Sequence, residues 1–231
     1  MTQLGGSRGK VVLVHGFANW PASLWPLAYS LRQAGYATLV PFYPSRRLPF
    51  DAIVDRLIEP VHRFAARNDG PLHFIGHSMG GLIIRAMIER QRPEHLGRVV
   101  MLGTPNEGSE IADMLHRARL SRLCMGNATA ALLTQREAEL TARLGKVDYP
   151  VGVIAGNRPL LNAPLSWPLP KPHDGMVSVA STHVEGETDH LILPLSHARL
   201  CWHRTVKSAV CRFLHDGRFS EQAQPGQAKH S

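Results

Sequence analysis

The sequence has few cysteines and no long apolar run. Its 231 residues include three cysteines, an odd number without a CxxC pair, which indicates idle thiols in a reducing compartment. No apolar stretch approaches the roughly 20 residues of a membrane-spanning helix. The N-terminal segment also lacks the small-residue cleavage site of a signal peptide. We therefore expect no membrane span and a cytoplasmic location.

Aromatic residues are scarce as well, at 6% of the chain, whereas the formal net charge is +8. A basic chain can bind nucleic acid or an anionic membrane surface. Here the lysines and arginines are scattered along the expected helices, and no basic stripe alternates with stacking aromatics. We therefore expect no nucleic-acid partner, and the sequence leaves the oligomeric state open.

Short strand-like runs alternate with helical patterns along most of the chain. Near-continuous apolar runs predict strands at 10–16, 36–42, 72–76, 98–103, 150–156 and 190–195. Apolar residues at helical spacing predict helices at 21–35, 50–70, 79–90 and 198–214. Asp51 is the expected N-cap of the second helix, and Pro60 is expected to kink or split it. This alternation predicts an α/β fold with a mostly parallel sheet of about six strands and helices on both faces.

No repeat or linker divides the chain, so we expect a single domain over residues 1–220. Residues 107–148 have a mostly helical pattern with two weak breaks, and we expect them to form a short helical cap or lid on that domain. Residues 221–231 are polar and are expected to be frayed.

The clearest chemical signal is the segment IGHSMGG, which contains Ser78. A G-x-S-x-G pattern between a strand and a helix predicts a nucleophile elbow, a tight turn that exposes a reactive serine. Gly76 and Gly80 would remove side chains that collide around such a turn. The N-terminus of the following helix would favour negative charge near the serine. The alternative is a glycine turn with a capping serine.

A serine nucleophile needs a general base, and its position along the chain selects one of thirteen histidines. His197 follows the last expected strand. Parallel strands bring their carboxyl ends to one edge of the sheet, so His197 should emerge beside Ser78. His190 precedes the body of that strand and should lie at the opposite edge, and His183 on a loop is the second choice.

The histidine in turn needs a carboxylate to orient it. Asp174 lies in the loop after the fifth expected strand, so it too should reach the edge that carries the serine. Asp189 is the rival, but it precedes the last strand. The order Ser78, Asp174, His197 is the nucleophile–acid–base order typical of this arrangement.

Ester chemistry also requires donors for the developing oxyanion. The backbone N–H groups of Met79, directly after the nucleophile, and Phe17, in the loop after the first strand, are the expected donors. Apolar residues of neighbouring loops are expected to line the substrate site and to favour apolar esters, although core packing is an alternative for each. These residues are Trp20, Leu160, Leu161 and Trp167.

Several motifs together resemble the α/β-hydrolase superfamily, and within it the bacterial lipase-like serine esterases. They are HGF at 15–17, GHSMGG at 76–81, LGTPNEGS at 102–109, DG at 174–175 and SH at 196–197. The resemblance covers about residues 10–214. It implies an α/β-hydrolase fold of eight strands whose first two antiparallel strands are missing here, since nine residues precede the first expected strand.

The same resemblance implies hydrolysis of carboxylic esters through an acyl-enzyme on Ser78, with a small-molecule ester as substrate, no metal and no cofactor. One departure is that HGFA replaces the HGGG donor loop of some lipases, which argues against the subfamilies that rely on HGGG. An acyltransferase, thioesterase or amidase with the same triad is an alternative, as is a non-catalytic binding module on this scaffold.

Overall fold

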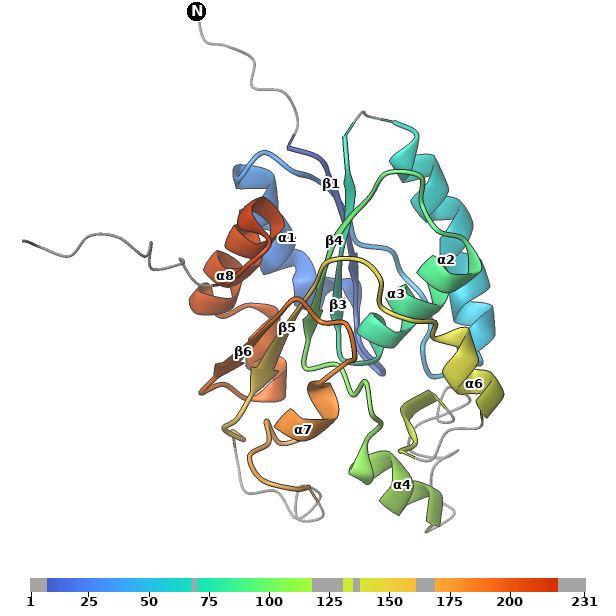
Figure 1. The fold of residues 1–231 in the computed structure, drawn as a ribbon, viewed down its shortest axis with the longest axis vertical. Helices are drawn as coiled ribbons and strands as arrows, with labels where there is room; N and C mark the ends of the chain where they lie inside the picture. Colours follow the sequence, from blue (N-terminus) through green and yellow to red (C-terminus); the bar gives the residue numbers. More distant parts are fainter. Residues whose placement is uncertain (1–7, 68–69, 118–130, 135–137, 161–168, 220–231) are drawn as a thin grey trace, which may run out of the picture.

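The protein contains a six-stranded parallel sheet between two layers of helices (Figure 1). The structure is a computed structural model and describes residues 8–67, 70–117, 131–134, 138–160 and 169–219. The strand order is β2-β1-β3-β4-β5-β6, and every neighbouring pair is parallel. This confirms the expected α/β fold. Within the described ranges β1 is the first strand, and no helix is long and apolar enough to cross a membrane.

The strands are short and the helices lie mostly between them in the chain. The strands are β1 (Lys10–Val14), β2 (Ala37–Leu39), β3 (Leu72–His77), β4 (Leu96–Leu102), β5 (Val151–Gly156) and β6 (Asp189–Leu193). The α-helices are α1 (Trp25–Gln33), α2 (Phe50–Ala65), α3 (Met79–Arg90), α4 (Glu110–Arg117), α6 (Ala138–Arg143), α7 (Val179–Thr182) and α8 (Arg204–Asp216). The described residues also contain the 3-10 helices η1 (Pro21–Leu24) and η4 (His197–Cys201).

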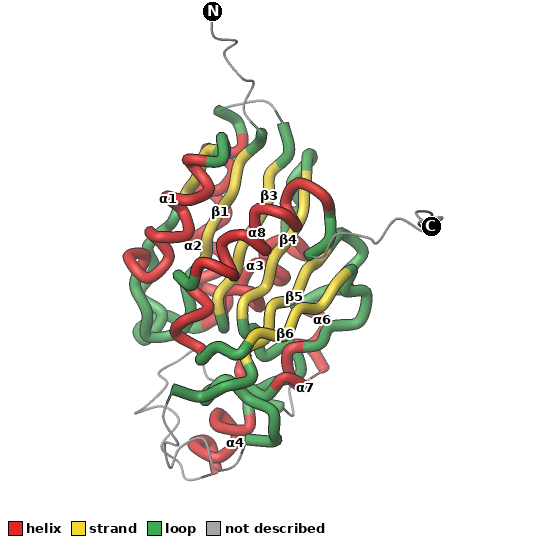
Figure 2. The backbone as a smooth tube through the Cα atoms, turned by 90° about the vertical axis from the view of Figure 1, so that its left-hand side faces the viewer, coloured by secondary structure: helices red, strands yellow, loops and turns green. Residues whose placement is uncertain are grey.

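Helices cover both faces of the sheet, which explains why its strands are almost continuously apolar. Figure 2 shows α1 and α8 in front of the sheet, and Figure 1 shows α2 and α3 on its other face. Successive residues of β1 alternate between the two layers. Val11 and Leu13 pack with α1 and α8, whereas Val12 and Val14 pack with α2 and α3.

Three local predictions were wrong. Pro49 occupies the N-cap position of α2, and Asp51 lies in the first turn, where its carboxylate accepts a 2.9 Å hydrogen bond from Arg90. Pro60 does not divide α2, because buried Leu57 and Val61 hold the helix against the core on both sides of the proline.

The closing helix expected at 198–214 is instead two elements, η4 and α8. His203 separates them with an extended backbone, and its ring nitrogen Nδ1 accepts a 3.3 Å hydrogen bond from the N–H of Thr205 at the start of α8. Of the expected cap at 107–148, the described part contains α4 and α6, and its motion as a lid stays a prediction.

His73 of β3 is a buried histidine that the sheet holds neutral. Its side chain is packed edge-on against Tyr36, and its Nδ1 accepts a 2.8 Å hydrogen bond from the N–H of Arg98. Burial, with a smaller contribution from the Arg98 charge, lowers the pKa of His73 from 6.5 to about 4. Between these two pH values the unfolded chain binds more protons than the folded one, so the contribution of His73 to stability is lost as the pH falls.

We predict that His73→Gln makes the protein less sensitive to acid. Between pH 7 and pH 5 the free energy of unfolding of the wild type should fall by roughly 1–2 kcal/mol more than that of the variant. Urea unfolding at the two pH values measures both changes. Equal losses in the two proteins would show that His73 is not held neutral by the fold.

Candidate active site

The turn between β3 and α3 holds Ser78 in an unusual backbone conformation. Its φ of 55° and ψ of −128° lie in a region that residues with a side chain rarely adopt. The N–H of Ser78 donates a 2.9 Å hydrogen bond to the carbonyl of Leu102 in β4, and its own carbonyl accepts one of 3.0 Å from Gly81. The strained turn is therefore fixed by backbone bonds on both sides.

Glycines surround this turn because the neighbouring backbone leaves no room for a Cβ. A Cβ at Gly80 would lie 2.2 Å from the carbonyl oxygen of Val14, and one at Gly76 would lie 2.4 Å from the nitrogen of Gly81. Both distances are far below van der Waals contact with backbone atoms that cannot rotate away. The close packing of β1, β3 and α3 around Ser78 thus requires the glycine pattern seen in the sequence.

Asp174 and His197 form a close pair. Oδ2 of Asp174 lies 2.7 Å from Nδ1 of His197, and the backbone N–H of His197 donates a 3.0 Å hydrogen bond to the carbonyl of Asp174. The other carboxylate oxygen, Oδ1, accepts hydrogen bonds of 2.9 and 2.8 Å from the N–H groups of Met176 and Val177. Since a carboxylate only accepts, Nδ1 of His197 is the protonated nitrogen.

The carboxylate of Asp174 stays ionised although it is 2% exposed. Burial by itself raises its pKa, but the electrostatic interaction and hydrogen bond with His197 and the two backbone hydrogen bonds outweigh burial and bring the pKa below its ordinary value. The buried carboxylate therefore carries its charge throughout the neutral pH range.

Leu102 and Gly103, at the end of β4, connect the serine turn with this pair. Leu102 accepts the hydrogen bond from Ser78, and a Cβ at Gly103 would lie 3.1 Å from both Oδ2 of Asp174 and Nδ1 of His197. Ser78, Asp174 and His197 thus lie at the same edge of the sheet, where β3, β4, β5 and β6 end.

His77 is a further residue of this site that sequence analysis missed. Its ring lies 4.6 Å from the ring of His197, and its Nε2–H donates a 3.1 Å hydrogen bond to the carbonyl of His197. Burial, together with the charge of His197, lowers the pKa of His77 to about 3. His77 is therefore a neutral side chain that supports the backbone of His197. It occupies the variable position before the serine in the G-x-S-x-G pattern, and that position did not indicate this contact.

The loop after β1 packs directly on the serine turn. A Cβ at Gly16 would lie 3.0 Å from Cβ of Ser78, and Ala18 has a positive φ of 51°. The N–H of Ala18 donates a 2.9 Å hydrogen bond to Oγ of Ser45, which holds the loop in this shape. Phe17 lies between Gly16 and Ala18 in this loop. Met79, the first residue of α3, is fully buried.

The other residues predicted for the site are more scattered. The Trp20 side chain is 64% exposed and stacks on Phe42 with ring centres 5.3 Å apart, and Leu160 is 70% exposed. Leu161 and Trp167 lie outside the described residues. Asp189 faces elsewhere, since its Oδ2 accepts a 2.7 Å hydrogen bond from the N–H of Phe219.

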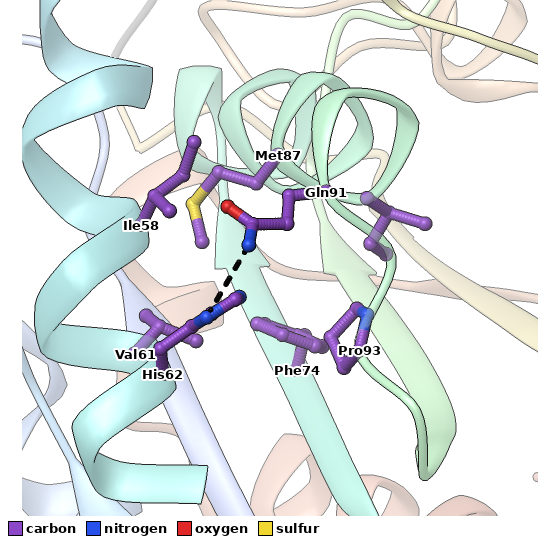
Figure 3. A pocket seen from close by; sticks show the side chains of 8 residues that line it. Ile58, Val61, His62, Phe74, Met87, Gln91 and Pro93 are labelled. Atoms are coloured by element: carbon purple, nitrogen blue, oxygen red, sulfur yellow. Dashed lines mark hydrogen bonds between the residues drawn. The ribbon is translucent and has the colours of Figure 1, made fainter.

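One cavity lies between α2 and the carboxyl end of α3 (Figure 3). The hydrogen bond between Gln91 and His62 crosses it, and Phe74 and Met87 line it. Its volume of about 10 Å³ holds at most one water molecule. Met87 and Gln91 lie two or more helical turns along α3 from Ser78, and the cavity has no room for a substrate, so it is not a substrate site.

Comparison with known proteins agrees with this fold. A sequence model of the alpha/beta hydrolase fold family matches residues 10–142. The chain belongs to the alpha/beta hydrolase fold family. It is similar to a triacylglycerol lipase of Pseudomonas fragi, with 27% identity over 150 residues that cover 62% of this chain. The match covers 50% of that curated relative, so the chain spans about half of its length.

Solved structures of this hydrolase fold resemble the protein as well. The mature lipase BlEst2 of Bacillus licheniformis has a TM-score of 0.65 at 16% identity, and the match covers 85% of this chain and 88% of the lipase. The phospholipase PlaB of Legionella pneumophila has a TM-score of 0.72 at 18% identity, with 93% and 60% of the two chains covered. At these identities the likeness shows a shared fold.

We predict that Gly80→Ala destabilises the protein more than Gly35→Ala. Gly35 has a positive φ of 89°, but a methyl group there would make only ordinary contact with the Arg8 side chain at 3.8 Å, whereas the new methyl group at position 80 would overlap the backbone of β1. Overpacking of this kind costs typically 1–3 kcal/mol or more, and a positive φ costs alanine about 1–2 kcal/mol. Urea unfolding measures both losses. A larger loss for Gly35→Ala would show that β1 can move away from the turn.

Proposed function

We propose that the protein hydrolyses carboxylic esters with apolar acyl or alcohol groups through an acyl-enzyme on Ser78. The observation that carries this proposal is the 2.7 Å contact of Asp174 with His197 at the sheet edge that also presents the strained Ser78. A serine, a histidine and an orienting carboxylate are the groups that nucleophilic ester cleavage needs. The similarity to a triacylglycerol lipase supports the same class of reaction.

In the proposed mechanism, His197 acts as the base. Its Nδ1–H is bonded to Asp174, so its Nε2 carries the lone pair that accepts the proton of the Ser78 hydroxyl. Oγ of Ser78 attacks the ester carbonyl, and the tetrahedral intermediate then expels the alcohol, which takes that proton from His197. Water repeats these steps on the acyl-enzyme and releases the acid. Asp174 keeps the imidazole in this tautomer and stabilises its positive charge.

The backbone N–H groups of Phe17 and Met79 are the proposed oxyanion donors. Met79 is the first residue of α3, and N–H groups in the first turn of a helix have no carbonyl partner within the helix. The contact of Gly16 with Ser78 supports the second donor, because it brings the loop that carries Phe17 to the nucleophile. The positive end of the α3 dipole adds to the stabilisation of the oxyanion.

The preference for apolar substrates rests on exposed side chains that follow the carboxyl ends of the strands. Trp20 and Phe42 follow β1 and β2, and Leu160 and Met176 follow β5. All four are at least 43% exposed although they are large and apolar. Apolar groups that gather at the edge of a proposed site would bind the acyl chain or the alcohol by the hydrophobic effect.

We expect Ser78→Ala to lower the turnover of a short-chain p-nitrophenyl ester by roughly 10⁴-fold or more, because the nucleophile is lost. A fluorophosphonate probe should label the wild type at Ser78 and leave the variant unlabelled. Ser30→Ala is the matched control, since Ser30 only donates to the carbonyl of Pro26 within α1. Full activity of Ser78→Ala would refute the proposed mechanism, and parallel assays with a thioester and an amide test the substrate class.

We expect Asp174→Asn to lower kcat by roughly 10³- to 10⁴-fold, because an asparagine favours the wrong tautomer of His197. Asp189→Asn should change kcat by less than about tenfold, since Asp189 bonds the backbone N–H groups of His190 and Phe219. The kinetics of both variants are compared below their melting temperatures. The reverse ranking would assign the orienting role to Asp189.

A further inference from the structure

Three side chains from the end of α7 to the start of β6 converge on one point. They are His183, Glu187 and His190, and we call them the His–Glu–His cluster. Nδ1 of His183 lies 2.7 Å from Oε1 of Glu187 and 2.9 Å from Nδ1 of His190. The third side of the triangle, from Nδ1 of His190 to Oε1 of Glu187, is 3.2 Å. His190 is near the start of β6, whereas His197 follows the end of that strand, so the cluster is separate from the proposed active site.

Neighbouring groups fix the orientation of two of these ligands. Thr182 donates its only hydroxyl proton to the carbonyl of Val179 at 2.6 Å, so its Oγ1 accepts the 3.3 Å hydrogen bond from Nε2–H of His190. This leaves a lone pair on Nδ1 of His190, directed into the cluster. The N–H of Val184 donates a 3.2 Å hydrogen bond to Oε2 of Glu187, which turns Oε1 toward the two rings.

We propose that the His–Glu–His cluster binds a zinc ion. Zinc takes imidazole nitrogen and carboxylate oxygen at about 2.0–2.2 Å, so the ligand atoms of a tetrahedral site lie roughly 3.3 Å apart. The three sides of the triangle, at 2.7, 2.9 and 3.2 Å, are up to about 0.6 Å shorter than that spacing, so the three ligand atoms need to move apart only slightly around the ion. Hydrogen bonds from Thr182 and Val184 to the outer atoms of the ligands match the supporting shell that orients metal ligands in proteins.

The cluster is accessible to solvent, so an ion can reach it and a water molecule can serve as the fourth ligand. The side chain of His183 is 51% exposed, whereas those of Glu187 and His190 are 18% and 11% exposed. His183 also lines an open groove of about 1130 Å³. Water from the groove completes the tetrahedron, and two histidines with one carboxylate form the remaining three ligands.

The segment that carries the cluster is itself acidic, which favours a cation. Residues 183–190 read HVEGETDH, with three acidic residues and no lysine or arginine, in a chain whose net charge is +8. Without metal, one proton on Nδ1 of His183 can be shared between Glu187 and His190. When zinc binds, the proton of His183 moves to Nε2, so Nδ1 of both histidines and Oε1 of Glu187 present lone pairs to the ion at once.

Zinc at this point would join the end of α7 to the start of β6. Both belong to the segment that connects Asp174 with His197, two residues 23 positions apart in the chain. The ion would therefore stabilise the connection between two proposed catalytic residues without contacting substrate. The inference does not depend on the proposed ester hydrolysis, because zinc binding is measured without a substrate.

The test is titration of the full chain, without a histidine tag and after treatment with a chelator, with zinc chloride. We expect one tight site per chain by isothermal titration calorimetry and a rise in melting temperature on adding zinc. His183→Gln changes an exposed side chain and so keeps the core intact. It should weaken the site by more than the roughly 10- to 100-fold typical of a change in an outer-shell partner.

Thr182→Val removes the hydrogen-bond partner of His190, together with the hydrogen bond from the Thr182 hydroxyl to Val179, and should weaken zinc binding by roughly 10- to 100-fold. His215→Gln is the control, because His215 is also exposed and pairs with a carboxylate, that of Asp216, outside the cluster. This control should bind zinc as the wild type does. Equal affinity of the wild type and His183→Gln, or absence of a one-to-one site in the wild type, would overturn the proposal and leave a hydrogen-bonded turn.

Discussion

The close approach of β1 to the turn at Ser78 is the constraint on which the rest of the site depends. β1 and β3 pair in register up to Val14 and Gly76, so the two strands end together. The carbonyl of Val14 then occupies the space that a side chain at residue 80 would need. This contact between backbones therefore explains the glycine at position 80, and it brings the loop after β1 next to the serine.

Chain order was sufficient to predict the edge of the sheet at which the chemically distinctive residues lie. In a parallel sheet every strand ends on the same side, so position in the sequence becomes position in space. Asp174 and His197 were expected at that edge, and they lie within hydrogen-bonding distance there. Their catalytic roles stay predictions. Asp189 is the first residue of β6, and the same rule explains why it lies away from His197, which follows the end of that strand.

Contacts between side chains from distant segments could not be read in this way. His77 and His197 are 120 positions apart, and which loop covers the end of β3 depends on the packing of the whole molecule. The errors at Pro60 and in the closing helix have a similar cause. Burial of α2 against the sheet overrides the tendency of Pro60 to break a helix, and the N-cap at His203 divides a pattern that looked continuous.

The substrate-binding residues were the least predictable part of the site. Trp20 and Leu160 lie on loops, where no helical or strand period restricts the direction of a side chain. Their large exposed fractions, 64% and 70%, follow from how the loops leave the sheet edge. The sequence therefore predicted the chemical groups of the proposed reaction better than the shape of the surface that receives the substrate.

The hydrogen bond from His77 to the carbonyl of His197 has a consequence for motion. His77 immediately precedes the serine, so this bond ties the backbone that carries the proposed base to the strand that carries the proposed nucleophile. A displacement of β3 is then accompanied by a displacement of the loop at His197. The distance between Ser78 and His197 therefore varies less than the position of either residue. The relative position of the proposed base and nucleophile, which must be accurate to a fraction of an ångström, is therefore less affected by movements of the surrounding loops.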